Sequence, residues 1–282
     1  MDTFALGNLS VHRIGFGAMQ LPGPGVMGPP RDRDAAIAVL RRAVELGVDH
    51  IDTAQFYGPD VSNELIRAAL HPYPDDLVLV SKVGAVRDAD GGWLPAQRPE
   101  ELRSAVEDNL RSLGVEQLGA VNLRLHDGES VALEDQLAEM VALREEGKIA
   151  GVGISTATRE QVQQAVEQAG IVCVQNAFSL LDRSDADVVE LCHGAGVAYV
   201  PYFPLGSAFP GTPKVVEDPA VLAVAARTGA TPAQVGLAWL LAHRDNVLLI
   251  PGTSSVAHLE ENVAVADVQL SPQDLEELER DR

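Results

Sequence analysis

The sequence lacks several features that mark secreted and membrane proteins. Its 282 residues include only two cysteines, Cys173 and Cys192, without CxxC spacing, so neither a disulfide framework nor a zinc site is expected. No run of about 18 apolar residues occurs, and the opening MDTFALGNLSVHR does not have the basic-then-apolar order of a signal peptide. We therefore expect a cytoplasmic protein with buried, reduced thiols, no metal ion and no membrane partner.

Positive charge is also scarce. The chain has 21 basic and 41 acidic residues, a formal net charge of −20, and no basic cluster. This balance argues against nucleic acid and anionic membranes as partners. Any anionic ligand must therefore be held by local features. Apolar residues nevertheless make up 46% of the chain, which is enough for a sizeable core.

Short β-branched runs alternate with longer helical patterns, a rhythm typical of βα units. Eight strands over this length fit an α/β protein with a (β/α)8 TIM barrel better than an open doubly wound sheet. A short N-terminal β-hairpin, FALGNLSVHRIG, precedes them, and no linker or repeat interrupts the chain, so we expect a single domain over residues 1–282. The predicted strands are Ile14–Ala18, Val48–Thr53, Leu77–Lys82, Ala120–Leu125, Ile149–Ser155, Ile171–Gln175, Ala198–Tyr202 and Val247–Ile250.

Helix boundaries are marked by particular residues. Asp34 is expected to open the first helix, and Gly47, Gly114 and Gly147 are expected to close three of them as C-caps. A dinucleotide-binding GxGxxG loop is not evident, because GFGAMQ lacks the third glycine and continues into LPGPGVMGPP, which is not expected to form a helix.

Chemically versatile side chains gather where the predicted strands end. Strand two ends with Asp52 and leads to Tyr57 in DHIDTAQFYG, strand three ends with Lys82 in VSKVG, and strand four ends in NLRLHDG with Arg124 and His126. Catalytic groups of such barrels collect at the carboxyl ends of the strands. We therefore expect these side chains to face one mouth.

This set has a chemical logic. A tyrosine is a poor acid at neutral pH, and we expect Lys82, held by Asp52, to lower the pKa of Tyr57 and make its proton available. A carbonyl oxygen that receives this proton leaves its carbon open to hydride. If Lys82 were absent, we would interpret Asp52 as a helix cap and Tyr57 as a packed aromatic residue.

The motifs together resemble the aldo-keto reductases, whose barrels use an Asp, Tyr, Lys and His set with a nicotinamide cofactor. The shared stretches, in the family's order along nearly the whole chain, are GFGAMQ, HIDTAQFYG, VSKVG, GVGIS, VQNAFS, YFPLG and IPGTSSVAHLEENV. Within the family the chain is most similar to the bacterial pyridoxal reductases, through GPGVMGPPRDR, WLPA, VNLRL and IPGTSSVAHL. The resemblance implies NAD(P)H-dependent reduction of a small aldehyde or ketone to an alcohol, with pyridoxal to pyridoxine as the first candidate reaction.

Two alternatives stay open beside pyridoxal. One is reduction of a keto sugar or another secondary-metabolite carbonyl. The other is a non-catalytic, nicotinamide-sensing binding subunit, because a fold does not settle a function.

By the same resemblance, Tyr57 is the proton donor, and Asp52 and Lys82 are the pair that tunes it. The family's usual histidine position falls on Arg124, while His126 lies two residues later on the same strand face. Either residue could fill the fourth catalytic position. We favour Arg124 because its guanidinium stays protonated and offers several donors.

The resemblance further implies a site for NADPH, with NADH as the alternative. Tyr202 would stack on the nicotinamide. The family often has a lysine and an arginine where this chain has Gly252 and His258, and Glu260 adds an acid nearby, so we expect a weakened preference for NADPH. The implied cofactor residues are Ser155, Thr156, Gln175, Tyr202, Leu205, Gly206, Ser207, Gly252, Thr253, Ser254, Ser255, His258, Glu261 and Asn262.

Substrate is expected over the nicotinamide, between βα loops. Met19 and Gln20 follow strand one, Phe56 precedes Tyr57, and Trp93 lies in the loop GAVRDADGGWLPAQRP. Trp93 could anchor a flat ring through its large apolar face. Its alternative role is a structural plug of the loop against the barrel.

Overall fold

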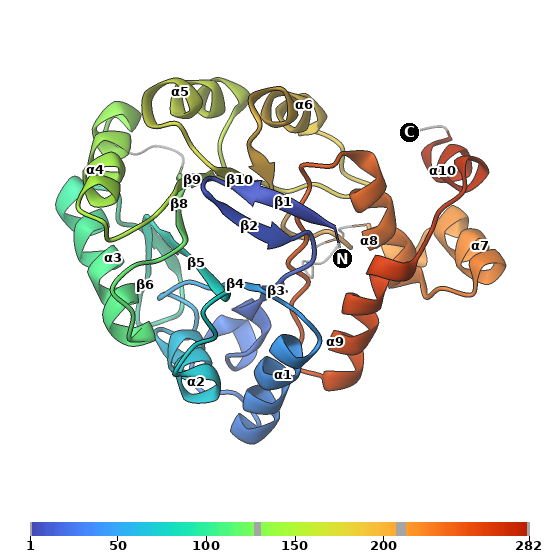
Figure 1. Cartoon of the computed structure of the whole chain (residues 1–282), viewed down its shortest axis with the longest axis horizontal. Helices are drawn as coiled ribbons and strands as arrows, with labels where there is room; N and C mark the ends of the chain where they lie inside the picture. Colours follow the sequence, from blue (N-terminus) through green and yellow to red (C-terminus); the bar gives the residue numbers. More distant parts are fainter. Residues whose placement is uncertain (1, 127–130, 207–212, 281–282) are drawn as a thin grey trace.

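The computed structural model describes residues 2–126, 131–206 and 213–280. Its main sheet has seven parallel strands in the order β11-β10-β9-β8-β5-β4-β3, which curl around a central axis (Figure 1). The strands are β3 (Phe16–Gly17), β4 (His50–Asp52), β5 (Val78–Val83), β8 (Ala120–Arg124), β9 (Val152–Ser155), β10 (Cys173–Gln175) and β11 (Ala198–Tyr199).

An eighth segment, residues 247–250, closes this sheet into a barrel. On one side the amide of Leu248 donates to the carbonyl of Tyr199 at 2.9 Å, and on the other the amide of Gly15 donates to the carbonyl of Leu249 at 2.8 Å. The segment makes parallel bridges to both neighbours without forming a longer ladder. The predicted (β/α)8 barrel is therefore confirmed, with strands shorter than the sequence indicated.

Helices cover the outside of the barrel (Figure 1). They are α1 (Arg33–Glu45), α2 (Val61–Leu70), α3 (Pro99–Leu113), α4 (Leu133–Glu145), α5 (Arg159–Ala169), α6 (Ala186–Ala195), α7 (Pro219–Thr228), α8 (Pro232–His243), α9 (Val256–Val263) and α10 (Pro272–Glu279). The first begins earlier than predicted, because Asp32 rather than Asp34 is its N-cap and accepts a hydrogen bond from the amide of Ala35. Gly47, Gly114 and Gly147 have positive φ at the ends of α1, α3 and α4, as the C-cap prediction requires.

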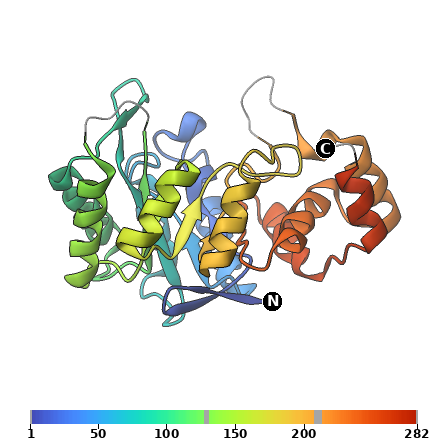
Figure 2. The same cartoon turned by 90° about the horizontal axis from the view of Figure 1, so that it is seen from above.

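The predicted hairpin closes one end of the barrel. Strands β1 (Thr3–Leu6) and β2 (Leu9–His12) are antiparallel, and they lie at the opposite end from β6 (Ala85–Arg87) and β7 (Trp93–Pro95) (Figure 2). Leu6 and Val11 are buried. They pack against an inward-facing apolar layer that contains Val80, Ala120, Cys173, Ala198, Val200 and Leu248.

Toward the ends of the strands the barrel interior becomes polar. The thiol of Cys173 donates to Oδ1 of Asn122 at 3.3 Å, and a Cβ on Gly153 would lie 2.2 Å from that oxygen, so all three residues face inward. Side chains on one face of a strand recur every second residue. Arg124 and Gln175 therefore point inward one step nearer the mouth. Both cysteines are buried and free, as predicted.

Arg13 joins the first and last strands of the barrel. Its Nε donates to the carbonyl of Val247 at 3.1 Å, and its Nη2 donates to the carbonyls of Leu241 at 2.8 Å and Arg244 at 2.6 Å. The side chain is partly buried. The guanidinium of Arg13 thus donates to three carbonyls near the point where the first and last strands close the barrel.

We predict that Arg13→Met lowers the free energy of unfolding by about 2–3 kcal/mol, because hydrogen bonds to a charged group are lost and their carbonyl partners are left unsatisfied. Urea unfolding measures this change. The matched control is Arg41→Met, which removes a single exposed bond to the carbonyl of Ala69 and should cost less than about 0.5 kcal/mol. Equal effects of the two substitutions would contradict the closure role.

Candidate active site

A buried ion pair lies at the centre of the barrel mouth. The ammonium of Lys82 on β5 contacts Oδ1 of Asp52, the last residue of β4, and donates to the carbonyl of Thr53 at 3.1 Å. Nε2 of Gln175 on β10 donates to the other carboxylate oxygen, Oδ2, at 3.0 Å. Side chains from two other strands, β5 and β10, thus satisfy one carboxylate, which is what a charge inside a protein requires.

Tyr57 lies directly against this pair. It follows β4 in a turn, where its amide donates to the carbonyl of Ala54 at 3.0 Å, and its ring centroid is 5.0 Å from Nζ of Lys82. Only 5% of the residue is exposed. Asp52, Lys82 and Tyr57 therefore meet as the strand ends predicted.

The direction of the Tyr57 pKa differs from the expectation that Lys82 lowers it. Burial raises the pKa of Tyr57 above its ordinary value, and this desolvation outweighs the lowering by Lys82, while Asp52 raises the pKa further. Burial alone would lower the pKa of Lys82, but Asp52 and then Tyr57 raise it more, so the net shift is upward. At neutral pH the phenol therefore keeps its proton and the amine keeps its charge.

Arg124 is the last residue of β8 and lies near the ring of Trp93. Its positive charge is among the influences that lower the pKa of this tyrosine, and its Cζ is 4.9 Å from the ring centroid of Trp93. Its carbonyl accepts a hydrogen bond from Nε2 of Gln97 at 2.7 Å. His126 follows the end of β8 as the last described residue before the gap, and the choice of Arg124 or His126 for the fourth catalytic position stays a prediction.

A cleft of 440 Å³ opens at this group. Of the sequence-predicted residues, it is lined by Met19, Gln20, Asp52, Tyr57, Gln175, Tyr202, Leu205, Gly206, Gly252, Thr253, His258, Glu261 and Asn262. Sequence reasoning missed Gly17, Pro201, Phe203, Pro204, Ala233, Ile250 and Pro251, most of which adjoin predicted residues along the chain. Ala233 comes from α8, where no motif marks it.

Several predicted residues do not line this cleft. They are Lys82, Arg124, His126, Ser155, Thr156, Ser254, Ser255, Phe56 and Trp93. Phe56 is 2% exposed and packs edge-on against both Tyr57 and Trp93, so it supports the mouth from behind. Ser207 lies outside the described residues.

The predicted cofactor residues between Gly252 and His258 are held by hydrogen bonds within the segment. Oγ1 of Thr253 accepts from the amide of Ser255 at 3.1 Å, and Oγ of Ser255 caps α9 by accepting from the amide of His258 at 3.4 Å. A Cβ on Gly252 would lie 2.5 Å from the carbonyl oxygen of Gly17. A side chain at this position would therefore require the backbone at Gly17 to shift.

Glu260 was expected to lie near the cofactor, but it pairs with an arginine outside the cleft. Its carboxylate accepts a hydrogen bond from Nε of Arg42 on α1 at 2.8 Å, and the residue does not line the cleft. Its negative charge is therefore paired on the outer surface. The expectation that Glu260 opposes an anionic cofactor loses its physical basis.

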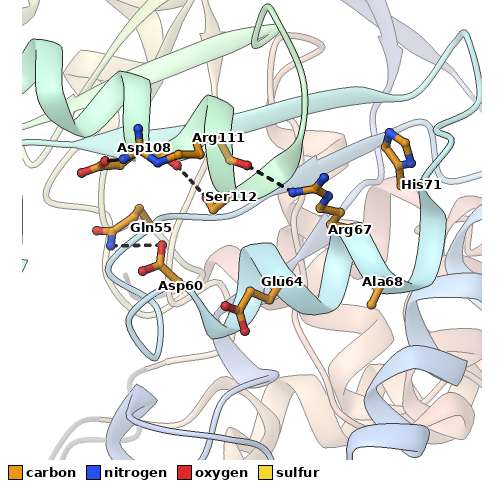
Figure 3. Close-up of a pocket in the computed structure, with 9 residues that line it drawn as sticks. All are labelled: Gln55, Asp60, Glu64, Arg67, Ala68, His71, Asp108, Arg111 and Ser112. Atoms are coloured by element: carbon orange, nitrogen blue, oxygen red, sulfur yellow. Dashed lines mark hydrogen bonds and ion pairs between the residues drawn. The ribbon is translucent and has the colours of Figure 1, made fainter.

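A second hollow, of 690 Å³, lies on the outer wall between α2 and α3 (Figure 3). Its polar groups bond to one another: Nε2 of Gln55 donates to Asp60 at 3.2 Å, and Nη1 of Arg67 donates to the carbonyl of Arg111 at 3.3 Å. None of the Asp52, Tyr57 and Lys82 group lines it.

The family model described as the aldo/keto reductase family matches residues 13–280. The chain belongs to this family. A pyridoxine 4-dehydrogenase of Escherichia coli is 50% identical over 283 residues, which cover 99% of this chain and 97% of that protein. An uncharacterized oxidoreductase of Schizosaccharomyces pombe is 40% identical over 269 residues, covering 95% and 86%.

Solved structures agree with this membership. A thermostable aldo-keto reductase in complex with the inhibitor epalrestat has a TM-score of 0.84 at 28% identity and covers 99% of both chains. An aldo/keto reductase from Klebsiella pneumoniae, in complex with NADP and acetate, has a TM-score of 0.81 at 27% identity and covers 96% and 91%. The aldo-keto reductase resemblance is confirmed, and the chain is an enzyme of the oxidoreductase class. Among its described residues, no helix is long and apolar enough to cross a membrane.

Thr156, one of the predicted cofactor residues, has an unusual backbone conformation. It follows β9 with φ of +59°, a left-handed conformation that asparagine tolerates and that a β-branched residue rarely adopts. Its amide donates to the carbonyl of Gln175 at 3.2 Å. Threonine is therefore strained at this position.

We predict that Thr156→Asn raises the free energy of unfolding by about 1 kcal/mol, because strain in this region costs roughly 1–3 kcal/mol. Thermal unfolding of both proteins measures the difference. The control is Thr158→Asn, an exchange at a helix N-cap with φ of −71°, which should change stability by only a few tenths of a kcal/mol. A gain no larger than that of the control would refute the strain.

Proposed function

We propose that this aldo-keto reductase uses NADPH to reduce an aldehyde or ketone to an alcohol, with Tyr57 as the proton donor. The observation that carries the proposal is the buried Asp52–Lys82 pair against Tyr57 at the wall of the cleft. A protonated phenol beside a fixed cation is suited to giving a proton to an oxygen that becomes negative during the reaction.

The residues present fit a nicotinamide dinucleotide. The cleft extends from Asp52 and Tyr57, past Tyr202, to His258 and Asn262 on α9. Tyr202 offers an aromatic face at the reacting end, and the start of α9 offers backbone N–H groups for a phosphate. The related Klebsiella pneumoniae reductases were solved with NADP and with NADPH, and NADH is the alternative cofactor because His258 stands where the family often has arginine.

NADPH, when bound, would supply the hydride that the carbonyl carbon accepts, and the C=O electron pair would move to the oxygen. Tyr57 donates its phenolic proton to that oxygen and is left as a phenolate. Lys82 remains positively charged and stabilises this phenolate, because Asp52 raises the pKa of the amine. Gln175 and Lys82 together hold Asp52 in place.

Pyridoxal is the substrate we propose, with pyridoxine as the product. The support is the 50% identity to a pyridoxine 4-dehydrogenase over almost the entire chain. Phe56, which packs against Tyr57, and Trp93, which packs against Phe56, add aromatic surface near the mouth. Keto sugars and other secondary-metabolite carbonyls are the alternative substrates.

The experiment follows NADPH oxidation with purified protein and three carbonyls: pyridoxal, a nitrobenzaldehyde and a keto sugar. We predict turnover that favours pyridoxal and a fall in kcat of about 10²–10⁴-fold in Tyr57→Phe, the range typical of general acid catalysis. NADPH binding, followed by fluorescence, should be unchanged.

The control variant is Tyr73→Phe, which removes a distant hydroxyl that donates to the carbonyl of Leu113 and should leave kcat unchanged. Activity on the other carbonyls alone would discard pyridoxal. Wild-type turnover in Tyr57→Phe would overturn the assigned proton donor. NADPH binding without any carbonyl reduction would favour a sensing subunit.

A further inference from the structure

Four buried polar side chains link the strands of the ion pair to the two helices outside them. Oγ1 of Thr53 donates to Oδ1 of Asn63 on α2 at 2.9 Å, and Nδ2 of Asn63 donates to Oδ1 of Asn109 on α3 at 3.0 Å. Oγ of Ser81 on β5 donates to the same oxygen of Asn109 at 2.6 Å. Each of the four residues is 0% exposed. We call this continuous chain of hydrogen bonds the asparagine bridge.

The asparagine bridge begins and ends next to the ion pair. Thr53 directly follows Asp52, and Ser81 directly precedes Lys82. Neighbouring side chains of a strand point to opposite faces, so the ion pair faces the barrel interior while Thr53 and Ser81 face the helices. The bridge therefore holds the same two chain segments from outside the barrel. None of its four side chains lines the cleft.

Polar side chains stand out in this layer of the protein. The buried faces of α2 and α3 otherwise consist mainly of apolar side chains: Leu65, Ile66, Leu70, Leu102, Val106 and Leu113. The two asparagines are nevertheless well satisfied, because Nδ2 of Asn63 also donates to Oγ of Ser112 at 2.9 Å and Nδ2 of Asn109 donates to the carbonyl of Ala105 at 2.8 Å. A buried polar network that is satisfied in this way rigidifies the groups it joins.

Thr53 is the member of the asparagine bridge that contacts the ion pair itself. Its amide donates to the carbonyl of Val80 at 2.8 Å, and its hydroxyl is held by Asn63. Its carbonyl accepts a hydrogen bond from the ammonium of Lys82 at 3.1 Å. The residue is therefore fixed through its amide and its side chain, and this fixes the direction in which its carbonyl points.

We propose that Asn63 and Asn109 are positioning residues for the ammonium of Lys82. They hold the carbonyl that accepts from this ammonium, and they hold the strand that carries it. The inference rests on the proposed function, in which Lys82 stabilises the phenolate of Tyr57. A fixed charge stabilises a reaction best when it is in place before the reaction begins. Without the asparagine bridge, the ammonium gains freedom and stabilises the phenolate less.

The activity test compares two substitutions in the asparagine bridge. Thr53→Val keeps the shape of the side chain and removes its hydroxyl, while Asn109→Leu removes the oxygen that accepts from Asn63 and Ser81. For the carbonyl that the wild type reduces fastest, we expect kcat to fall about tenfold in both variants, the smaller end of the effect of a hydrogen bond to a charged group. KM should change little, because the bridge does not line the cleft. Thr53→Ser, which keeps a hydroxyl, should restore most of the loss.

The matched control is Asn246→Leu. Asn246 is also 0% exposed, and its Nδ2 donates to the carbonyl of Val197 at 3.0 Å, where the last strand of the barrel begins. This substitution removes a buried asparagine without touching the asparagine bridge. It should lower the free energy of unfolding and leave kcat at the wild-type value.

A second measurement follows Lys82 itself and requires no turnover. The chain has only three lysines, Lys82, Lys148 and Lys214, so enzyme made with isotope-labelled lysine can be followed by NMR one ammonium group at a time. Lys148 and Lys214 pair with glutamates on the outside of the protein and serve as internal references. In the cofactor-free enzyme, the ammonium protons of Lys82 should exchange with water about tenfold faster in Thr53→Val and Asn109→Leu than in the wild type. The control variant should match the wild type.

Wild-type kcat in both bridge variants would overturn the proposal, and so would a loss of kcat with unchanged exchange at Lys82. An equal loss of kcat in Asn246→Leu would also overturn it, because general destabilisation would then explain the effect. Failure of the proposed function is a different result, in which the wild type reduces no carbonyl. The exchange at Lys82 would still show in that case whether the asparagine bridge positions the ammonium.

Discussion

The ion pair between Asp52 and Lys82 is the interaction on which the rest of the site depends. It lies inside the barrel, where an unpaired charge is not tolerated, and removing one partner of such a pair typically costs about 3–5 kcal/mol. The carboxylate is satisfied from β5 and β10 together. The closed barrel therefore does more than support the loops, because only its curvature brings Lys82 and Gln175 to the same carboxylate.

The pair shapes the behaviour of Tyr57. A lysine beside a tyrosine was expected to make the phenol more acidic, but burial has the larger effect and the pKa of Tyr57 is raised. This direction suits a proton donor. The phenol holds its proton until a stronger base, the developing alkoxide, is formed beside it. Lys82 then contributes most when the phenolate appears, since its charge is kept by Asp52.

Much of the fold and part of the site could be predicted from the sequence. The βα rhythm and the strand ends sufficed to place Asp52, Lys82 and Tyr57 together, because parallel strands of a barrel finish at one mouth. The bond between Gln175 and Asp52 could not be foreseen, since it joins residues 123 positions apart whose contact depends on barrel closure. The Arg42–Glu260 ion pair could not be predicted from the sequence for the same reason, because its residues are far apart in the chain. Predictions from neighbouring residues were wrong by small shifts, as at the start of α1. Asp34 was predicted to open this helix, but the nearby Asp32 is its N-cap.

The most direct test of this account is the ionisation of Tyr57 in the intact enzyme. Ultraviolet absorbance is followed through alkaline pH for the wild type and for Tyr57→Phe, and the difference between the two curves isolates the one phenol. The account predicts that Tyr57 ionises above pH 10, its ordinary value, or remains protonated until the protein unfolds. A transition clearly below that value would contradict it, because Lys82 would then outweigh burial and the site would hold a phenolate ready to accept a proton.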